Sequence, residues 1–123
     1  MAVADVQRAQ RVDAMPARWT NFAAAQPGVA SAYNALRDAC AAAGPLDDRT
    51  AALVKLAVSV GRGSLRSVHR HAKKALRAGA SAAELRHAAL LALPTIGLPA
   101  TLDAVKWIEE SIVESTGERG DAA

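Results

Sequence analysis

Three histidines and two serines are the residues of this chain best suited to chemistry. His69 and His71 lie in a stretch that begins at Ser64, Ser67 stands four residues before His71, and His87 follows further along the chain. An imidazole exchanges protons near neutral pH and binds transition metals. A serine hydroxyl can position a substrate or, beside an oriented base, attack it. The pattern favours proton transfer, metal binding or nucleophilic catalysis here.

A helix predicted from Ser64 to about residue 78 must position the first four of these residues. At about 100° per residue, Ser64, Ser67 and His71 share one stripe at the margin of an apolar face. His69 falls on the opposite margin of that face. We expect His71 to be the functional residue, as a general acid or base, and the alternative is a hydrogen-bonded histidine of the core.

Metal binding and nucleophilic catalysis are the alternatives for these side chains. His69, His71 and His87 could hold zinc, copper, iron or nickel. However, residues two apart on a regular helix point in nearly opposite directions, so His69 and His71 cannot chelate one ion without a distortion or a second subunit. Ser67 can reach His71 at i,i+4, but no third group to orient the base is evident. Ser64 is equally explained as a helix cap.

A basic stripe follows the same stretch at helical spacing. It is interpreted as a solvated face that could pair with acidic residues of the last helix, or as a capture site for a small anion. Its side chains are not interleaved with aromatic residues and the net charge is only +3, so nucleic-acid binding is not expected. The stripe comprises Arg62, Arg66, Arg70, Lys74 and Arg77, and the acidic candidates are Asp103, Glu109, Glu110 and Glu114.

The composition predicts an all-helical protein around these residues. Of the 123 residues, 51% are apolar, 31 are alanine and 3% are aromatic. Alanine is the best helix former, whereas aromatic and β-branched residues favour strands. Helix-capping and helix-breaking residues divide the chain into seven predicted helices. The first three are Val3 to Ala14, a short segment with Pro16 in its first turn that is broken at Pro27-Gly28, and Val29 to Ala43. The other four are a helix capped by Asp47 or Asp48 and interrupted at Gly61 and Gly63, Ser64 to Ala78, a helix that begins at the Ser81–Glu84 capping box and is bent or ended at Pro94 and Gly97, and Leu98 to Gly117.

Length and composition bound the remaining possibilities. The chain predicts a single domain over residues 1–117 with a polar tail at 118–123. Its alanine-rich core would be thin, so we expect a homo-oligomer. The single cysteine, Cys40, excludes a disulfide framework, a Cys-only zinc site and a dithiol centre within one chain. No apolar run could span a membrane and the first ten residues lack a signal core, which favours a cytoplasmic protein without membrane contact.

The spacing of these residues resembles the carboxymuconolactone decarboxylase and alkylhydroperoxidase D family. The resemblance rests first on Ser64-x-x-Ser67-x-x-x-His71, followed by Ala75, Gly79-Ala80 and Glu84. It extends upstream to Leu46-Asp47-x-x-Thr50 and Leu53-x-x-Leu56-Ala57-Val58, and downstream to Gly97-Leu98-Pro99-Ala100. It implies this family's helical bundle, assembled as a trimer or hexamer, with a cavity near a subunit interface.

The departures from the family decide what chemistry the resemblance implies. Both cysteines of the peroxidase branch are serine here, at positions 64 and 67, its relay glutamate falls on Ala52, and the histidine some members carry between the cysteines falls on Arg66. Serine cannot perform thiol–disulfide exchange, so peroxidase activity is excluded. The decarboxylase branch also lacks the cysteines and shares Gly61-Arg62, His71 and Gly79, although its glutamate after Gly-Arg is missing here.

The resemblance therefore implies a non-redox enzyme, without a cofactor, that acts on a small organic acid or lactone. Arg62 or Arg66 would hold the carboxylate of the substrate, His71 would donate the proton, and Ser64 and Ser67 would help to position the substrate. Two alternatives stay open: a metal-binding or sensing module built on the three histidines, and an inactive oligomeric scaffold.

Overall fold

The computed structural model describes residues 17–117, and this part contains six α-helices and no strand. The all-α prediction is therefore confirmed. The described residues fall into two compact units that divide between Pro45 and Leu46, and each unit is described separately below; the single domain over 1–117 stays a prediction. The helix predicted from Val3 to Ala14 and the tail at 118–123 lie outside the described residues. No helix in the described range has the length and apolar character needed to cross a membrane.

The first unit contains α2 (Ala17–Ala25) and α3 (Pro27–Ala42). Pro27 was expected to lie in a break before α3, but it begins this helix instead. The first position of a helix suits proline because the backbone N–H there has no partner within the helix. The ring of Trp19 lies 6.0 Å from that of Phe22 and 5.5 Å from that of Tyr33, so aromatic contacts join the two helices.

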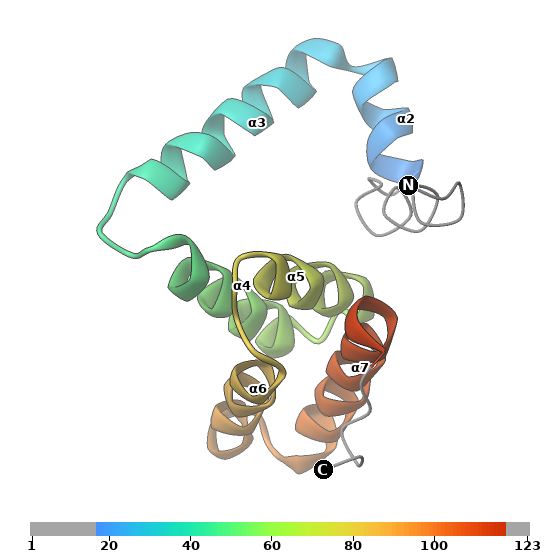
Figure 1. Cartoon of the computed structure of the whole chain (residues 1–123). Helices are drawn as coiled ribbons and strands as arrows, with labels where there is room; N and C mark the ends of the chain where they lie inside the picture. The colour runs from blue at the N-terminus through green and yellow to red at the C-terminus, as the bar shows by residue number, and fades with distance from the viewer. Residues whose placement is uncertain (1–16, 118–123) are drawn as a thin grey trace, which may run out of the picture. The chain divides into compact units, whose positions relative to one another are not determined.

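The second unit is a ring of four helices. These are α4 (Asp48–Arg62), α5 (Leu65–Arg77), α6 (Ala82–Ile96) and α7 (Leu98–Thr116). Helix α5 packs against α4 and α7, and α6 packs against the same two helices from the other side (Figure 1). The order around the ring is thus α4, α5, α7, α6, and α5 has α4 on one margin and α7 on the other.

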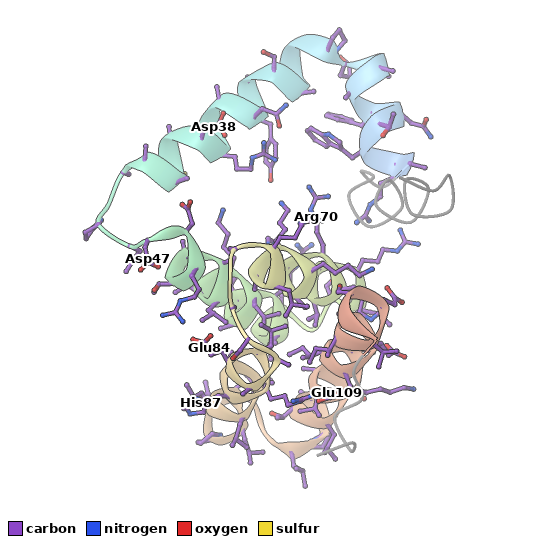
Figure 2. All side chains as sticks on the ribbon, in the orientation of Figure 1. Asp38, Asp47, Arg70, Glu84, His87 and Glu109 are labelled. Carbon is purple, nitrogen blue, oxygen red and sulfur yellow. The ribbon has the colours of Figure 1, made fainter. Side chains whose placement is uncertain are left out.

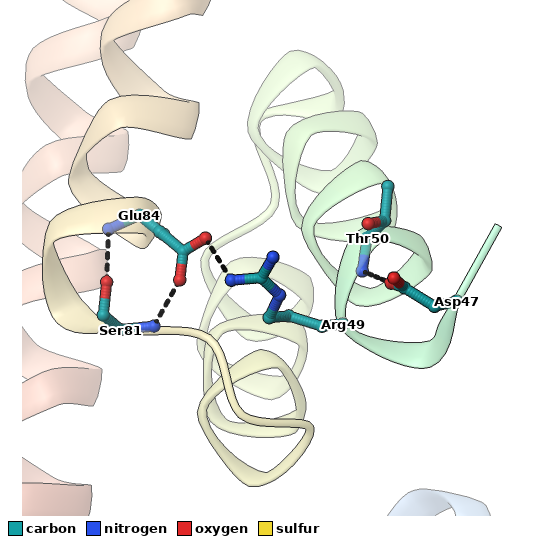
Figure 3. A network of polar contacts seen from close by, with 5 residues as sticks. All are labelled: Asp47, Arg49, Thr50, Ser81 and Glu84. Carbon is teal, nitrogen blue, oxygen red and sulfur yellow. Dashed lines mark hydrogen bonds and ion pairs between the residues drawn. The ribbon is translucent and has the colours of Figure 1, made fainter.

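Side-chain caps begin three of these four helices. Asp47 Oδ1 accepts from the Thr50 N–H at 2.8 Å, and Ser64 Oγ accepts from the Ser67 N–H at 3.3 Å. Ser81 and Glu84 form the predicted capping box, with bonds of 3.1 Å and 2.9 Å (Figure 3). Each cap satisfies a backbone N–H that the first turn leaves without a partner, so the starts of α4, α5 and α6 follow from the local sequence.

Arg49 ties two of these capped ends together. Its Nη1 donates to Glu84 Oε2 at 2.8 Å, which joins the first turn of α4 to the first turn of α6 (Figure 3). The bond from the Ser81 backbone N–H, assisted by Arg49, holds the pKa of Glu84 below its ordinary value. The Glu84 carboxylate therefore stays ionised at neutral pH.

Gly63, Gly97 and Gly117 end their helices as predicted, whereas Gly61 and Pro94 do not. Gly63 and Gly117 cap α4 and α7 in the left-handed region, with φ of 76° and 77°. Gly61 lies inside α4 and Pro94 lies inside the last turn of α6, so neither residue interrupts its helix. Pro94 cannot donate the backbone bond that a residue at this position would make to the carbonyl of Leu90, and α6 ends soon after it, at Ile96.

The apolar core lies inside the four-helix ring. Four leucines before and after the turn between α6 and α7, at positions 90, 91, 98 and 102, remain more than half exposed. The four-helix ring therefore leaves apolar surface uncovered near this turn. The buried apolar residues are Leu56, Val60, Val68, Ala72, Ala75, Ala80, Leu85, Ala89, Ala104, Ile108 and Ile112.

Candidate functional site

His71 lies on the margin of α5 that faces α4, partly buried, as the helical wheel predicts. Burial, together with charge repulsion from Lys74, Arg70 and Lys55, lowers the pKa of this imidazole to about 4. His71 is therefore neutral at pH 7. A neutral imidazole can accept a proton or donate a hydrogen bond, but it must first gain a proton to act as an acid.

A chain of hydroxyl groups connects the two helices next to this histidine. The oxygens of Ser59 and Ser67 lie 3.0 Å apart, and Ser59 Oγ donates to the Lys55 carbonyl at 3.0 Å. A hydroxyl has one proton, so the bond between the serines must use the proton of Ser67. The Ser67 hydroxyl therefore donates to Ser59, and this arrangement does not present Ser67 to His71 as a nucleophile.

The contact between the serines fixes how α4 and α5 face each other. Helices α4 and α5 run antiparallel (Figure 1). From the contact between Ser59 and Ser67, Lys55 lies one turn earlier on α4 and His71 one turn later on α5, so the two residues face each other. The effect of the Lys55 charge on the imidazole agrees with this placement. We call the set Lys55, Ser59, Ser67 and His71 the α4–α5 margin.

Sequence reasoning missed Lys55 and Ser59 as members of this site. Ser59 is 4% exposed, although serine is polar. Thr101 and Ser111 are also buried, and each donates to the carbonyl four residues earlier in its own helix. Among these three buried residues of the described chain, Ser59 is the one whose hydroxyl also contacts another helix. The available signal was the i,i+4 spacing of Lys55 and Ser59, which puts both polar residues on the same side of their helix.

The arginines expected to bind substrate lie at different distances from the imidazole. Arg62 shares the margin of α4 with Lys55 and Ser59, but two turns away from Lys55. Arg66 is exposed, and the helical wheel places it about 140° around α5 from His71. Arg70 precedes His71 directly and contributes to its charge environment (Figure 2). The cations that act on His71 thus differ from those predicted.

His69 occupies the other margin of α5 and faces α7. Its Nε2 lies 3.0 Å from Glu110 Oε1, and one turn on, Lys73 forms an ion pair with Glu114 at 2.5 Å. Two of the acidic residues expected to pair with α5, Glu110 and Glu114, do so. Their partners are His69 and Lys73, which were not included in the predicted basic stripe. His69 and His71 therefore interact with different neighbouring helices.

The three histidines are not brought together within the chain. His87 is exposed on α6, a helix that scarcely contacts α5 (Figure 2). Within residues 17–117, no three His, Cys, Asp or Glu side chains lie close enough to hold a metal ion. A centre that used all three histidines would need ligands from more than one subunit, and the metal-binding alternative stays a prediction.

The family of the chain follows from its comparison with known proteins. Residues 27–110 match the model of the carboxymuconolactone decarboxylase family. The chain belongs to this family. The match runs from the start of α3 well into α7, which confirms the resemblance read from the sequence and extends it to α3. Neither the curated proteins nor the solved structures include a match to this chain.

This family member has one cysteine, and it is not in the site. Cys40 is exposed on α3, whereas serine stands at both cysteine positions of the peroxidase branch, on the α4–α5 margin and at its edge. The chemistry present at that margin is an imidazole, two hydroxyls and a lysine, with further cations beside them. Such a set can bind an anion and move a proton, but one chain cannot form a disulfide there.

Proposed function

We propose that this protein is a non-redox enzyme of the carboxymuconolactone decarboxylase family that acts on a small organic acid or lactone. The observation that carries the proposal is the placement of His71, partly buried on the α4–α5 margin among the positive charges of Lys55, Arg70 and Lys74. Cations beside a proton-transferring group are what a reaction of a carboxylate requires. His71 is the proton-transfer residue of this proposal.

A decarboxylation at this site would proceed in two balanced events. The bond between the substrate carbon and its carboxylate breaks, carbon dioxide leaves, and the electron pair stays on the carbon as an enolate. Protonated His71 then gives its proton to that carbon and becomes neutral. The cations hold the carboxylate before it leaves and stabilise the enolate oxygen afterwards. Ser64 and Ser67 contribute to the shape and polarity of the site.

Self-association belongs to the same proposal. The four exposed leucines near the α6–α7 turn leave an apolar surface that a second copy of the chain would cover. We expect a homo-oligomer, a trimer or a hexamer. The mass of the particle in solution, determined by light scattering, tests this part, and a monomer at micromolar concentration would contradict it.

Replacement of His71 tests the catalytic role. A panel of small carboxylated lactones and keto acids in D2O reports both carbon dioxide release and deuterium incorporation at carbon, whichever product forms. Loss of a general acid or base costs about 10²–10⁴ in rate, so His71→Gln should turn over an identified substrate at least about a hundredfold more slowly than the original protein. His69→Gln is the matched control, because His69 lies on the opposite margin of α5 and contacts Glu110.

The outcomes separate the proposal from its alternatives. Full turnover by His71→Gln would remove His71 from the mechanism. If the intact oligomer turns over no member of the panel, the scaffold interpretation is favoured. If His69→Gln loses as much activity as His71→Gln, the two histidines act together, as the metal-binding alternative requires, and metal analysis by mass spectrometry would follow.

A further inference from the structure

We propose that the α4–α5 margin is a proton-linked anion site, in which a small carboxylate bound beside Lys55 draws a proton onto His71. This inference rests on the proposed function for the class of ligand. It goes further by assigning Lys55 as the residue that couples the bound anion to the imidazole. The acid of the reaction would then exist only in the loaded site.

The geometry places the coupling residue and the imidazole on facing helices. The Ser59–Ser67 contact of 3.0 Å joins α4 to α5. One helical turn away from this contact on each helix, Lys55 of α4 lies opposite His71 of α5. Ser59 also binds the Lys55 carbonyl, so the backbone at Lys55 belongs to the same hydroxyl chain. An anion that contacts the Lys55 ammonium from this margin therefore lies next to the imidazole.

Within the described four-helix unit, the charges that act on His71 are positive. Helix α4 contributes Lys55, and α5 itself contributes Arg70 and Lys74. Helix α7 packs on the other margin of α5, where its Glu110 and Glu114 pair with other residues. Arg70 and Lys74 have additional interactions, so Lys55 is the residue whose removal tests the coupling most directly.

Coulombic attraction gives the coupling its direction. In the free site, burial and three like charges disfavour the imidazolium, so His71 is neutral at pH 7. An opposite charge within about 4–6 Å favours the charged form and shifts a pKa by about 1–3 units. A bound carboxylate supplies this charge and offsets the repulsion from Lys55. The ligand and the proton therefore promote each other's binding, as linkage requires.

The test measures the pKa of His71 directly, by NMR of its ring protons. These are assigned by their loss in His71→Gln. Trifluoroacetate is the probe, because it is a small carboxylate that stays ionised throughout the titration, and its fluorine signal reports binding. Saturating trifluoroacetate should raise the pKa of His71 by at least one unit. Trifluoroacetamide, which has the same shape but no charge, should leave the pKa unchanged.

Replacement of Lys55 tests the coupling. Lys55→Gln should raise the pKa of His71 in the free protein, because a repulsive charge is gone. It should also weaken trifluoroacetate binding at least threefold and reduce the rise that the ligand causes. Lys55→Arg should preserve the coupling. Lys106→Gln makes the same change of charge at an exposed position of α7, and should behave like the original protein.

Two results would overturn the inference. One is a His71 titration that trifluoroacetate leaves unchanged, including the case in which the fluorine signal shows no binding. The other is a Lys55→Gln protein whose His71 pKa and ligand affinity match those of Lys106→Gln. Turnover that depends on His71 without any anion-linked shift would contradict this inference alone. An anion-linked shift in a protein without any turnover would leave it standing and contradict the proposed function.

Discussion

The two units of this protein use the same kind of helix but stabilise it differently. In the four-helix unit, Leu56, Leu85 and Ile112 are completely buried. In α2 and α3, the one buried residue is Ala30, and apolar side chains such as Leu36 stay mostly exposed. Burial of a leucine contributes about 1.5–3 kcal/mol relative to an exposed one, and that of an alanine much less. Tertiary packing therefore stabilises α4–α7, whereas α2 and α3 depend more on local helix propensity.

This difference in packing indicates which unit can hold side chains in a fixed geometry. The α4–α5 margin borders the buried core, because Val68 and Ala72 of α5 are both inaccessible to solvent. Helices fixed by such packing hold side chains in one geometry, and a proton-transfer group needs this precision. The exposed thiol of Cys40, on α3, lacks such support. The packed helices of the four-helix unit therefore suit the candidate site.

The largest predicted effect comes from truncating a buried leucine of the four-helix unit, compared with the same change at an exposed leucine of α3. Leu56→Ala should destabilise the four-helix unit by about 2–5 kcal/mol, because the removed group is fully buried and leaves a cavity. Leu36→Ala, the same change on α3 at 60% exposure, should cost no more than about 0.5 kcal/mol. Urea unfolding followed by tryptophan fluorescence measures both.

Each unit contains its own tryptophan, so the two transitions can be separated. Trp107 packs against the core of the four-helix unit, and Trp19 lies in α2. Trp19→Phe leaves Trp107 as the reporter for Leu56→Ala, and Trp107→Phe leaves Trp19 as the reporter for Leu36→Ala. Equal losses of stability in the two experiments would show that α2 and α3 are packed as tightly as the ring, contrary to the comparison.

Local signals in the sequence predicted the helices well because caps act within a few residues. Asp47, Ser64 and Ser81 each bind a backbone N–H three residues later, and these bonds do not depend on the rest of the fold. The errors occurred at Pro27 and Gly61. Pro27 was expected to lie in a break, but it begins α3, because the first backbone N–H of a helix has no partner within it. Gly61 was expected to interrupt its helix, but α4 continues through it to Arg62.

The sequence predicted the positions of the site residues around α5, but not the residues of α4 that face them. The helical wheel of the stretch after Ser64 placed His71 and His69 on opposite margins, and the structure agrees. It could not show that Lys55 and Ser59 face His71 and Ser67, since that depends on how α4 packs against α5. Pairing between helices is tertiary information that a single wheel does not contain. Arg66 was proposed through the family resemblance, and it lies about 140° around α5 from His71.

A smaller effect is expected from the helix caps, and it sharpens the same comparison. Ser81→Ala should cost the four-helix unit about 1 kcal/mol, because it leaves the Glu84 N–H without its acceptor and breaks the capping box. The cap position of α3, Gln26, makes no side-chain hydrogen bond, so Gln26→Ala should have almost no effect on stability. Urea unfolding with the same two tryptophan reporters measures the stability of each unit. A larger loss of stability for Gln26→Ala than for Ser81→Ala would contradict this prediction.

The smallest effect concerns one ion pair in each unit. Arg86 of α6 holds Glu109 of α7 with two bonds, of 2.6 Å and 3.3 Å, whereas Arg37 and Asp38 are neighbours on α3 at 3.9 Å, with side chains that are 40% and 78% exposed. Exposed pairs contribute about 0–1 kcal/mol, and bidentate geometry lies at the upper end. Arg86→Gln should therefore destabilise its unit by about 0.5 kcal/mol at low salt, and Arg37→Gln should change nothing measurable. High salt should remove most of the Arg86 effect, because screening weakens exposed pairs. A loss that persists in high salt would instead assign the effect to packing of the Arg86 side chain against α7.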